Sequence, residues 1–306
     1  MSALAILGIV TNVIDITVFT RQGFQDSVNI SLTAMAVWDL LKCVIGLAMR
    51  VYGPLGWYSP VYRKIWKNIT SPTLLYLQVF ANYVSYILAS YVAFERCLCV
   101  CIPFKVKLVV TPRLTFIMMI VISALVMVSF GIIFFVYDIY WVFDPAYNQS
   151  VVVYSYNAFY NKCGTSVLEY FTFIGMLNPI FAFVVIAICT IIIVYQLRKM
   201  SKFRIRSVHK VSTGDKNAKD MSSRDKQVVK MLLVVIIAYI LALIPRLALH
   251  VGKLINVEFY YLKTYHNLFT VCAYGVMTVD FLNASVHLFI YLTMSSNFRH
   301  TFLQLF

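Results

Sequence analysis

The sequence has few charged residues. Asp, Glu, Lys and Arg together make up 12% of the 306 residues, hydrophobic residues make up 61%, and the mean hydropathy is +0.81. A water-soluble fold of this length could not cover its surface with so few charges. The apolar runs also lack the strict polar and apolar alternation of outer-membrane strands, which argues against a β-barrel. The composition therefore predicts an all-α membrane protein with spanning helices.

Seven apolar runs are long enough to cross a bilayer. They lie near residues 3–20, 29–53, 70–101, 114–137, 167–197, 226–252 and 264–292, and a short amphipathic segment, 295–306, follows the last. This pattern predicts one domain over residues 1–306, a seven-transmembrane helix bundle with a short amphipathic helix at its end. We expect no cleavable signal peptide, because the apolar start runs directly into a span that carries Asn12.

Acidic residues are scarce. There are 12 Asp and Glu against 26 Lys and Arg, so the formal net charge is +14. Residues 198–226 contain ten Lys and Arg, whereas 138–166 contain only Lys162. By the positive-inside rule, this predicts that the amino terminus lies outside and the carboxyl terminus in the cytoplasm. We expect the protein in the plasma membrane. Topology and attraction to the lipid bilayer account for the excess charge, so nucleic-acid binding is not indicated.

Several classes of site are missing. The seven cysteines show no metal spacing and no obvious extracellular pair; Cys97, Cys99 and Cys101 alternate at a helix end, where S-acylation and plain packing both stay open. No Ser/His/Asp, paired-carboxylate or metal arrangement meets the geometry of catalysis, so we do not expect an enzyme. There is no internal repeat and no matching pair of Gly/Pro-broken spans, which argues against a transporter or channel.

Two glycosylation sequons begin at Asn68 and Asn148, as Asn-Ile-Thr and Asn-Gln-Ser. Both fall in loops that the charge distribution places outside the cell, where the glycosylating enzyme can reach them. We therefore predict a glycoprotein modified at these two asparagines.

Arg96 stands beside Glu95 where the third apolar run gives way to a basic segment. An arginine in a membrane helix costs roughly 2.5–3.5 kcal/mol at the centre and less near the end, so a functional role is the default interpretation. In a resting bundle Arg96 can pair with Glu95, and its release would let it meet an incoming protein helix. The pair predicts a conformational switch.

These features resemble a rhodopsin-like (class A) G-protein-coupled receptor over nearly the whole chain. The residues that carry the resemblance, in order along the spans, are Gly8, Asn12, Asn29, Leu32, Asp39, Arg96, Pro179, Pro245, Tyr291, Asn297, Phe298, Arg299 and Phe302. The stretch 21–32 is similar to invertebrate, especially molluscan, chemosensory-type receptors. The resemblance implies a chemosensory or neuropeptide-like receptor that binds an extracellular small molecule or peptide. It also implies activation of a heterotrimeric G protein by population shift.

The resemblance also implies roles at the cytoplasmic end. Asp225 would face Arg96 from the sixth span and hold the closed state through an ion pair, although an ordinary solvated acid is the other interpretation. Pro103 and Phe104 match the turn and apolar plug that family members press into the G protein. Tyr291 matches the switch residue at the end of the seventh span.

Deeper in the membrane, Asp39 needs partners. The resemblance offers Asn12, Ser85, Asn283 and His287. Such a site can hold Na⁺, at Asp39 and Ser85 above all, or a proton, and no other cofactor is expected. Lys42, one turn along, can instead neutralise Asp39 and leave Na⁺ unnecessary. His287 and Leu288 stand where the family usually has Asn and Pro, which keeps a divergent, non-signalling protein as an alternative.

On the outer side, alignment to the family predicts a ligand site. Its residues are Gln78, Asn82, Arg246, His250 and Asp280. Gln78 stands where amine receptors carry an aspartate, and Phe281 stands where opsins carry the Schiff-base lysine, so neither a monoamine nor retinal is expected. An unpaired Arg246 would be costly in the membrane, so either Asp280 or a ligand anion is its partner.

Overall fold

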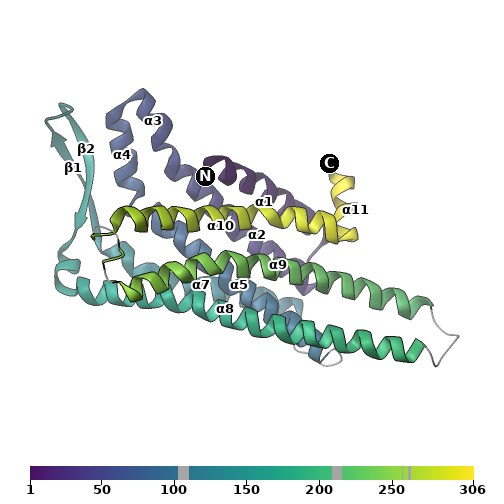
Figure 1. The fold of residues 1–306 in the computed structure, drawn as a ribbon. Helices are drawn as coiled ribbons and strands as arrows, with labels where there is room; N and C mark the ends of the chain where they lie inside the picture. Colours follow the sequence, from purple (N-terminus) through teal and green to yellow (C-terminus); the bar gives the residue numbers. More distant parts are fainter. Residues whose placement is uncertain (103–109, 209–215, 257, 261–262) are drawn as a thin grey trace.

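The structure is a computed structural model that describes residues 1–102, 110–208, 216–256, 258–260 and 263–306; from 200 to 226 only the course of the helices is described. Seven helices in these ranges are long and apolar enough to cross a membrane. Figure 1 shows them running side by side as one bundle. The predicted all-α seven-helix bundle is confirmed, and the chain is a multi-pass membrane protein.

The bundle helices are α1 (Ser2–Gln22), α2 (Ser27–Arg50), α5 (Leu74–Cys101), α7 (Pro112–Gly131) with a 3-10 turn η1 (Ile132–Phe135), α8 (Ala158–Val208), α9 (Lys216–Ile255) and α10 (His266–Met294), followed by α11 (Ser296–Leu305). Local chemistry explains several boundaries. Gly23 ends α1 at φ 85, a conformation that glycine adopts readily. Asp26 accepts a hydrogen bond from the Val28 N–H at 3.1 Å and caps α2. The Ser295 hydroxyl caps α11 in the same way through the Phe298 N–H.

The connection between the fourth and fifth spans, which the sequence predicted as an outer loop, contains a β-hairpin. Strands β1 (Tyr137–Asp144) and β2 (Gln149–Tyr156) pair antiparallel, and α8 begins at Ala158. Both strands are rich in Val, Tyr, Trp and Phe, which favour strands. The connection from the second span to the third is also helical, as α3 (Tyr52–Tyr58) and α4 (Pro60–Thr70).

The two ends of the bundle differ. The hairpin, α3 and α4 lie together at one end, called here the hairpin end (Figure 1). At this end α4 packs on β2, and Asn68 donates its Nδ2–H to the Val152 carbonyl at 2.7 Å. The opposite end, called here the α11 end, carries α11, the end of α8 and the start of α9 (Figure 1).

Helix α5 is the centre of the bundle. In its most apolar stretch 61% of the residues are buried inside the protein, whereas the corresponding share is 22% in α7 and 22% in α8. It contacts α2, α7, α8 and α9. Polar side chains on α5 are therefore held away from lipid, at positions where several helices can reach them.

Candidate functional site

At the α11 end of α5, Arg96 is buried and held in place. Its guanidinium donates to the neighbouring Glu95 carboxylate and, at 3.3 Å, to the Ser27 hydroxyl at the start of α2. Glu95 is 1% exposed and also accepts hydrogen bonds from Ser27 and Ser31. The acid thus joins the start of α2 to the end of α5 and keeps Arg96 from extending past the end of the bundle.

The side chains of three predicted switch residues are not described. Pro103 and Phe104 fall in the segment 103–109, and the Asp225 side chain lies in the part of α9 whose side chains are not described. The bridge from Asp225 to Arg96 stays a prediction. Tyr291 is 2% exposed on α10 and packs on the Phe298 ring of α11 with a centroid distance of 5.4 Å.

Near the middle of the bundle, Asp39 has a complete set of partners. Its Oδ1 accepts from the Lys42 ammonium at 2.7 Å and from the Ser85 hydroxyl at 2.9 Å. Its Oδ2 accepts from the Tyr239 hydroxyl at 3.3 Å and lies 3.4 Å from Nδ1 of His287. The five side chains come from α2, α5, α9 and α10, so Asp39 connects four helices. Tyr239 is the member of this cluster that the sequence did not predict.

This arrangement does not fit a sodium ion at Asp39 and Ser85. A cation there would face the Lys42 ammonium, and the Ser85 hydroxyl already directs its proton toward the carboxylate. The Lys42 ammonium occupies the position beside the Asp39 carboxylate that a sodium ion would need. Across the described residues, no group of three or more His, Cys, Asp and Glu is placed to hold a metal ion.

Asn12 and Asn283 were predicted in the same site, but within the described part of the chain they make no hydrogen bond to Asp39. Asn12 donates its Nδ2–H groups to the Gly8 carbonyl at 2.7 Å and to the Ala284 carbonyl at 3.0 Å, which joins α1 to α10. Asn283 is 6% exposed, and its Oδ1 has no partner among the described residues. Asn12 is therefore a structural link between helices.

Asp15 on α1 is a buried acid outside every predicted site. It is 0% exposed, and neither of its carboxylate oxygens has a hydrogen-bond partner among the residues that the structure describes. Burying an unpaired charge is costly. The signal was present in the sequence as an acid inside an apolar run.

Toward the hairpin end, Arg246 on α9 pairs with Asp280 on α10. The Asp280 carboxylate also accepts from the Tyr86 hydroxyl of α5. The guanidinium carbon lies 5.5 Å from the ring centroids of both Tyr83 and Tyr86. Of the two partners that the sequence left open for Arg246, the structure shows Asp280 in contact with it. The faces of the two tyrosine rings further stabilise the guanidinium.

The other predicted ligand residues are buried as well. Asn82 donates to the Gln78 carbonyl at 3.3 Å, one turn away, and His250 is 8% exposed. Gln78 is 1% exposed, and both ends of its side-chain amide have no partner among the described residues. Lys253, which the sequence did not predict, lies 4.9 Å from the Tyr260 ring and has no acidic partner in the described ranges.

The hairpin end distinguishes the two sequons. Asn148 is exposed in the β1–β2 turn with φ 49, whereas Asn68 is half-buried and its amide is bonded to β2. Nearby, Lys64 and Asp144 form an ion pair at 2.6 Å. The hydrogen bond from Lys64 lowers the pKa of the Asp144 carboxyl and raises that of the ammonium. Glycosylation stays a prediction at both sites, and the geometry favours Asn148.

Comparisons with known proteins agree with this architecture. No curated protein matches the chain. A family model described as serpentine type 7TM GPCR chemoreceptor Srw matches residues 2–306. This is a family of chemoreceptors, not of enzymes. The match covers all seven membrane helices and α11, so the chain belongs to the Srw family of serpentine seven-transmembrane GPCR chemoreceptors.

Proposed function

We propose that this chemoreceptor lies in the plasma membrane, binds an extracellular ligand and activates a heterotrimeric G protein. The hairpin end would face outward and the α11 end the cytoplasm. The ten basic residues within 198–226 support this orientation, as does the exposed sequon at Asn148. Ligand binding near Gln78 and Arg246 would then change the position of Arg96 at the cytoplasmic end.

The observation that carries the proposal is the enclosure of Arg96 by Glu95 and Ser27. These groups give the guanidinium one stable position in the closed bundle. When the ion pair with Glu95 breaks, the guanidinium could take a second position, directed out of the bundle toward a G-protein helix. An ion pair that exchanges an internal partner for an external one is a two-state switch.

The test needs no ligand. Glu95→Gln removes the charge that holds Arg96 and keeps the side-chain shape. We expect it to raise the basal nucleotide exchange of the purified receptor with heterotrimeric G protein, since the closed state loses part of its stabilisation. Adding Arg96→Ala to this variant should abolish the exchange.

Arg198→Ala is the matched control, because Arg198 is an exposed arginine at the same end on α8. It should leave exchange unchanged in both backgrounds. If Glu95→Gln folds and reaches the surface but exchange does not rise with any G protein, the switch is refuted. The divergent, non-signalling alternative suggested by His287 and Leu288 would then be favoured.

We further propose that the ligand is an organic anion. Arg246 is neutralised by Asp280, whereas Lys253 has only aromatic rings against its ammonium in the described ranges. A carboxylate reaching Lys253 would remove that imbalance, and the free amide of Gln78 can accept and donate hydrogen bonds to the rest of the ligand. Binding should therefore depend on Lys253 more than on Arg246.

A panel of small carboxylates and their amides tests this ligand class by thermal stabilisation of the purified receptor. At least one carboxylate should stabilise it while the matching amide does not, and Lys253→Met should remove the effect. Stabilisation by neutral or cationic compounds that survives Lys253→Met would contradict the anionic class.

A further inference from the structure

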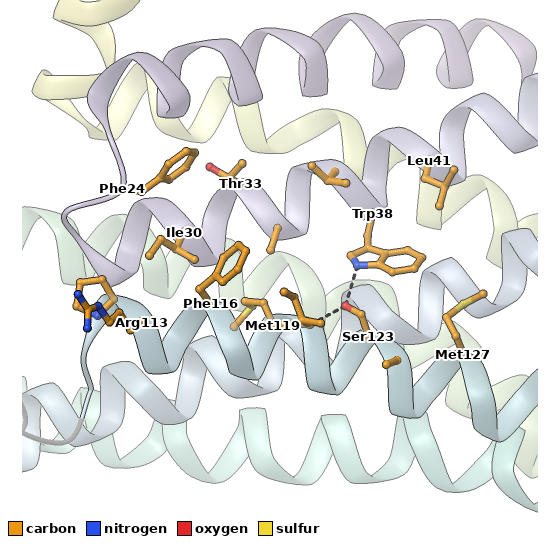
Figure 2. A pocket seen from close by; sticks show the side chains of 15 residues that line it. Phe24, Ile30, Thr33, Trp38, Leu41, Arg113, Phe116, Met119, Ser123 and Met127 are labelled. Atoms are coloured by element: carbon orange, nitrogen blue, oxygen red, sulfur yellow. Dashed lines mark hydrogen bonds between the residues drawn. The ribbon is translucent and has the colours of Figure 1, made fainter.

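A groove opens between α2 and α7 on the lipid-facing side of the bundle. Its volume is about 780 Å³, and it is lined by the turn after α1, by α2 and by α7. Figure 2 shows Phe24 and Arg113 at one end and Leu41 and Met127 at the other. Small residues, Ala34 and Ala124 among them, leave room between the two helices. This groove belongs to neither the switch nor the ligand site.

The groove is built for a lipid chain. Its walls are almost entirely apolar, and Phe24 and Phe116 at its rim are 46% and 56% exposed. From Ile30 to Leu41 the α2 wall is about 16 Å long at 1.5 Å per residue, roughly half of a 30 Å hydrocarbon core. The groove therefore spans one leaflet. The proposed orientation, on which this step rests, makes it the cytoplasmic leaflet.

The polar groups of the groove select the headgroup. Midway along it, Trp38 donates to the Ser123 hydroxyl at 2.9 Å and Ser123 donates to the Met119 carbonyl, so these groups are already engaged. Arg113, at the end, is exposed and forms no ion pair with any described residue. The Arg113 guanidinium is therefore the polar group of the groove that is available to a ligand. Its full positive charge at the membrane surface suits an anion better than a sterol hydroxyl.

We propose that this groove binds an anionic glycerophospholipid of the cytoplasmic leaflet. One acyl chain lies between α2 and α7, and the net negative headgroup contacts the Arg113 guanidinium, whereas a choline headgroup, with its own cation beside the phosphate, is neutral overall and is attracted less. The same helix α2 holds Glu95 through Ser27 and Ser31. A lipid that fixes α2 against α7 therefore also steadies the enclosure of Arg96.

The experiment measures lipid retention by native mass spectrometry on receptor purified from bilayers of phosphatidylcholine and phosphatidylserine. Wild-type receptor should retain phosphatidylserine in preference to phosphatidylcholine. Arg113→Gln should lower that preference about fivefold, since one basic residue near the surface contributes about that factor. Arg198→Gln, the control, removes an exposed arginine from the same end but outside the groove and should leave the preference intact.

A second variant tests the chain-binding part. Ala124→Phe fills the groove from an exposed position, so it should reduce retention of both phospholipids without unfolding the receptor, which a melting curve checks. Equal preference in wild type and Arg113→Gln would overturn the proposal. Retention of cholesterol instead of phospholipid, abolished by Ala124→Phe but indifferent to Arg113→Gln, would assign the groove to a sterol and would also overturn it. Neither result depends on G-protein coupling.

Discussion

Asp39 and Asp15 are both fully buried acids on neighbouring helices, but their surroundings differ. Asp39 accepts hydrogen bonds from Lys42, Ser85 and Tyr239, whereas Asp15 has no partner among the described residues. Asp280 and Glu95 resemble Asp39, because each forms an ion pair with a basic side chain. The difference separates acids that hold helices together from an acid whose charge the fold does not stabilise.

The largest effect is expected at the buried pair of Arg246 and Asp280. Arg246→Ala removes the cation and leaves Asp280 buried with only Tyr86 as donor, which should cost about 3–5 kcal/mol of unfolding free energy. Adding Asp280→Asn should restore much of the loss by removing the orphaned charge. Thermal melting and surface expression of the single and double variants measure this. If the single and the double variant were both as stable as the wild type, the ion pair would contribute little to stability.

Lys42→Met tests the same principle at Asp39, with a smaller loss expected, about 2–4 kcal/mol, because the hydroxyls of Ser85 and Tyr239 still donate hydrogen bonds to the carboxylate. This variant should also gain a stabilisation by Na⁺ over choline that the wild type lacks, since the place of the ammonium becomes free. Melting curves in the two salts measure both effects. Sodium stabilisation of the wild-type receptor would contradict neutralisation by Lys42.

Asp15→Asn should raise the free energy of unfolding, whereas the preceding variants lower it. Removing a carboxyl that is buried without a partner takes away the cost of desolvating or protonating it, so we expect a gain of about 1–2 kcal/mol. Asp39→Asn is the matched control and should lose stability. A loss of stability in Asp15→Asn would show that this carboxylate has a partner of its own, such as ordered water.

The smallest effect is expected at the exposed pair of Lys64 and Asp144. The lowered pKa of Asp144 means that its contribution is complete above the unfolded-state value of about 3.9 and is lost as the pH falls through the lower folded value. The protection of the hairpin amides against hydrogen exchange, relative to the intrinsic rate at each pH, should therefore fall only in acid. Lys64→Met should remove that pH step and change the global melting temperature little, because exposed pairs stabilise weakly. A clear drop in melting temperature at neutral pH would contradict this.

The seven spans could be predicted because long apolar runs need no partner information. The hairpin over 137–156 could not, since it depends on α4 packing against β2 and on pairing between strands. Within the site, the Arg96 and Glu95 pair followed from adjacency, and Lys42 was offered for Asp39 because it lies three residues along a helix. Tyr239 and Lys253 were missed, since nothing near them in the chain marks their surroundings. Asp15 stands out as an acid inside an apolar run, but its lack of a partner among the described residues depends on how the helices pack.

By itself the sequence determined that this chain spans a membrane seven times, which segments carry the positive charge, and which polar residues need partners. These properties depend on the hydropathy and charge of short segments, which are local. The tertiary structure decided which partner each buried group received. Asp280 accepts from residues 34 and 194 positions away, and Asp15 receives no partner from the described residues. Such choices depend on how the helices pack, because a buried charge is satisfied only by groups that the bundle brings within hydrogen-bond distance.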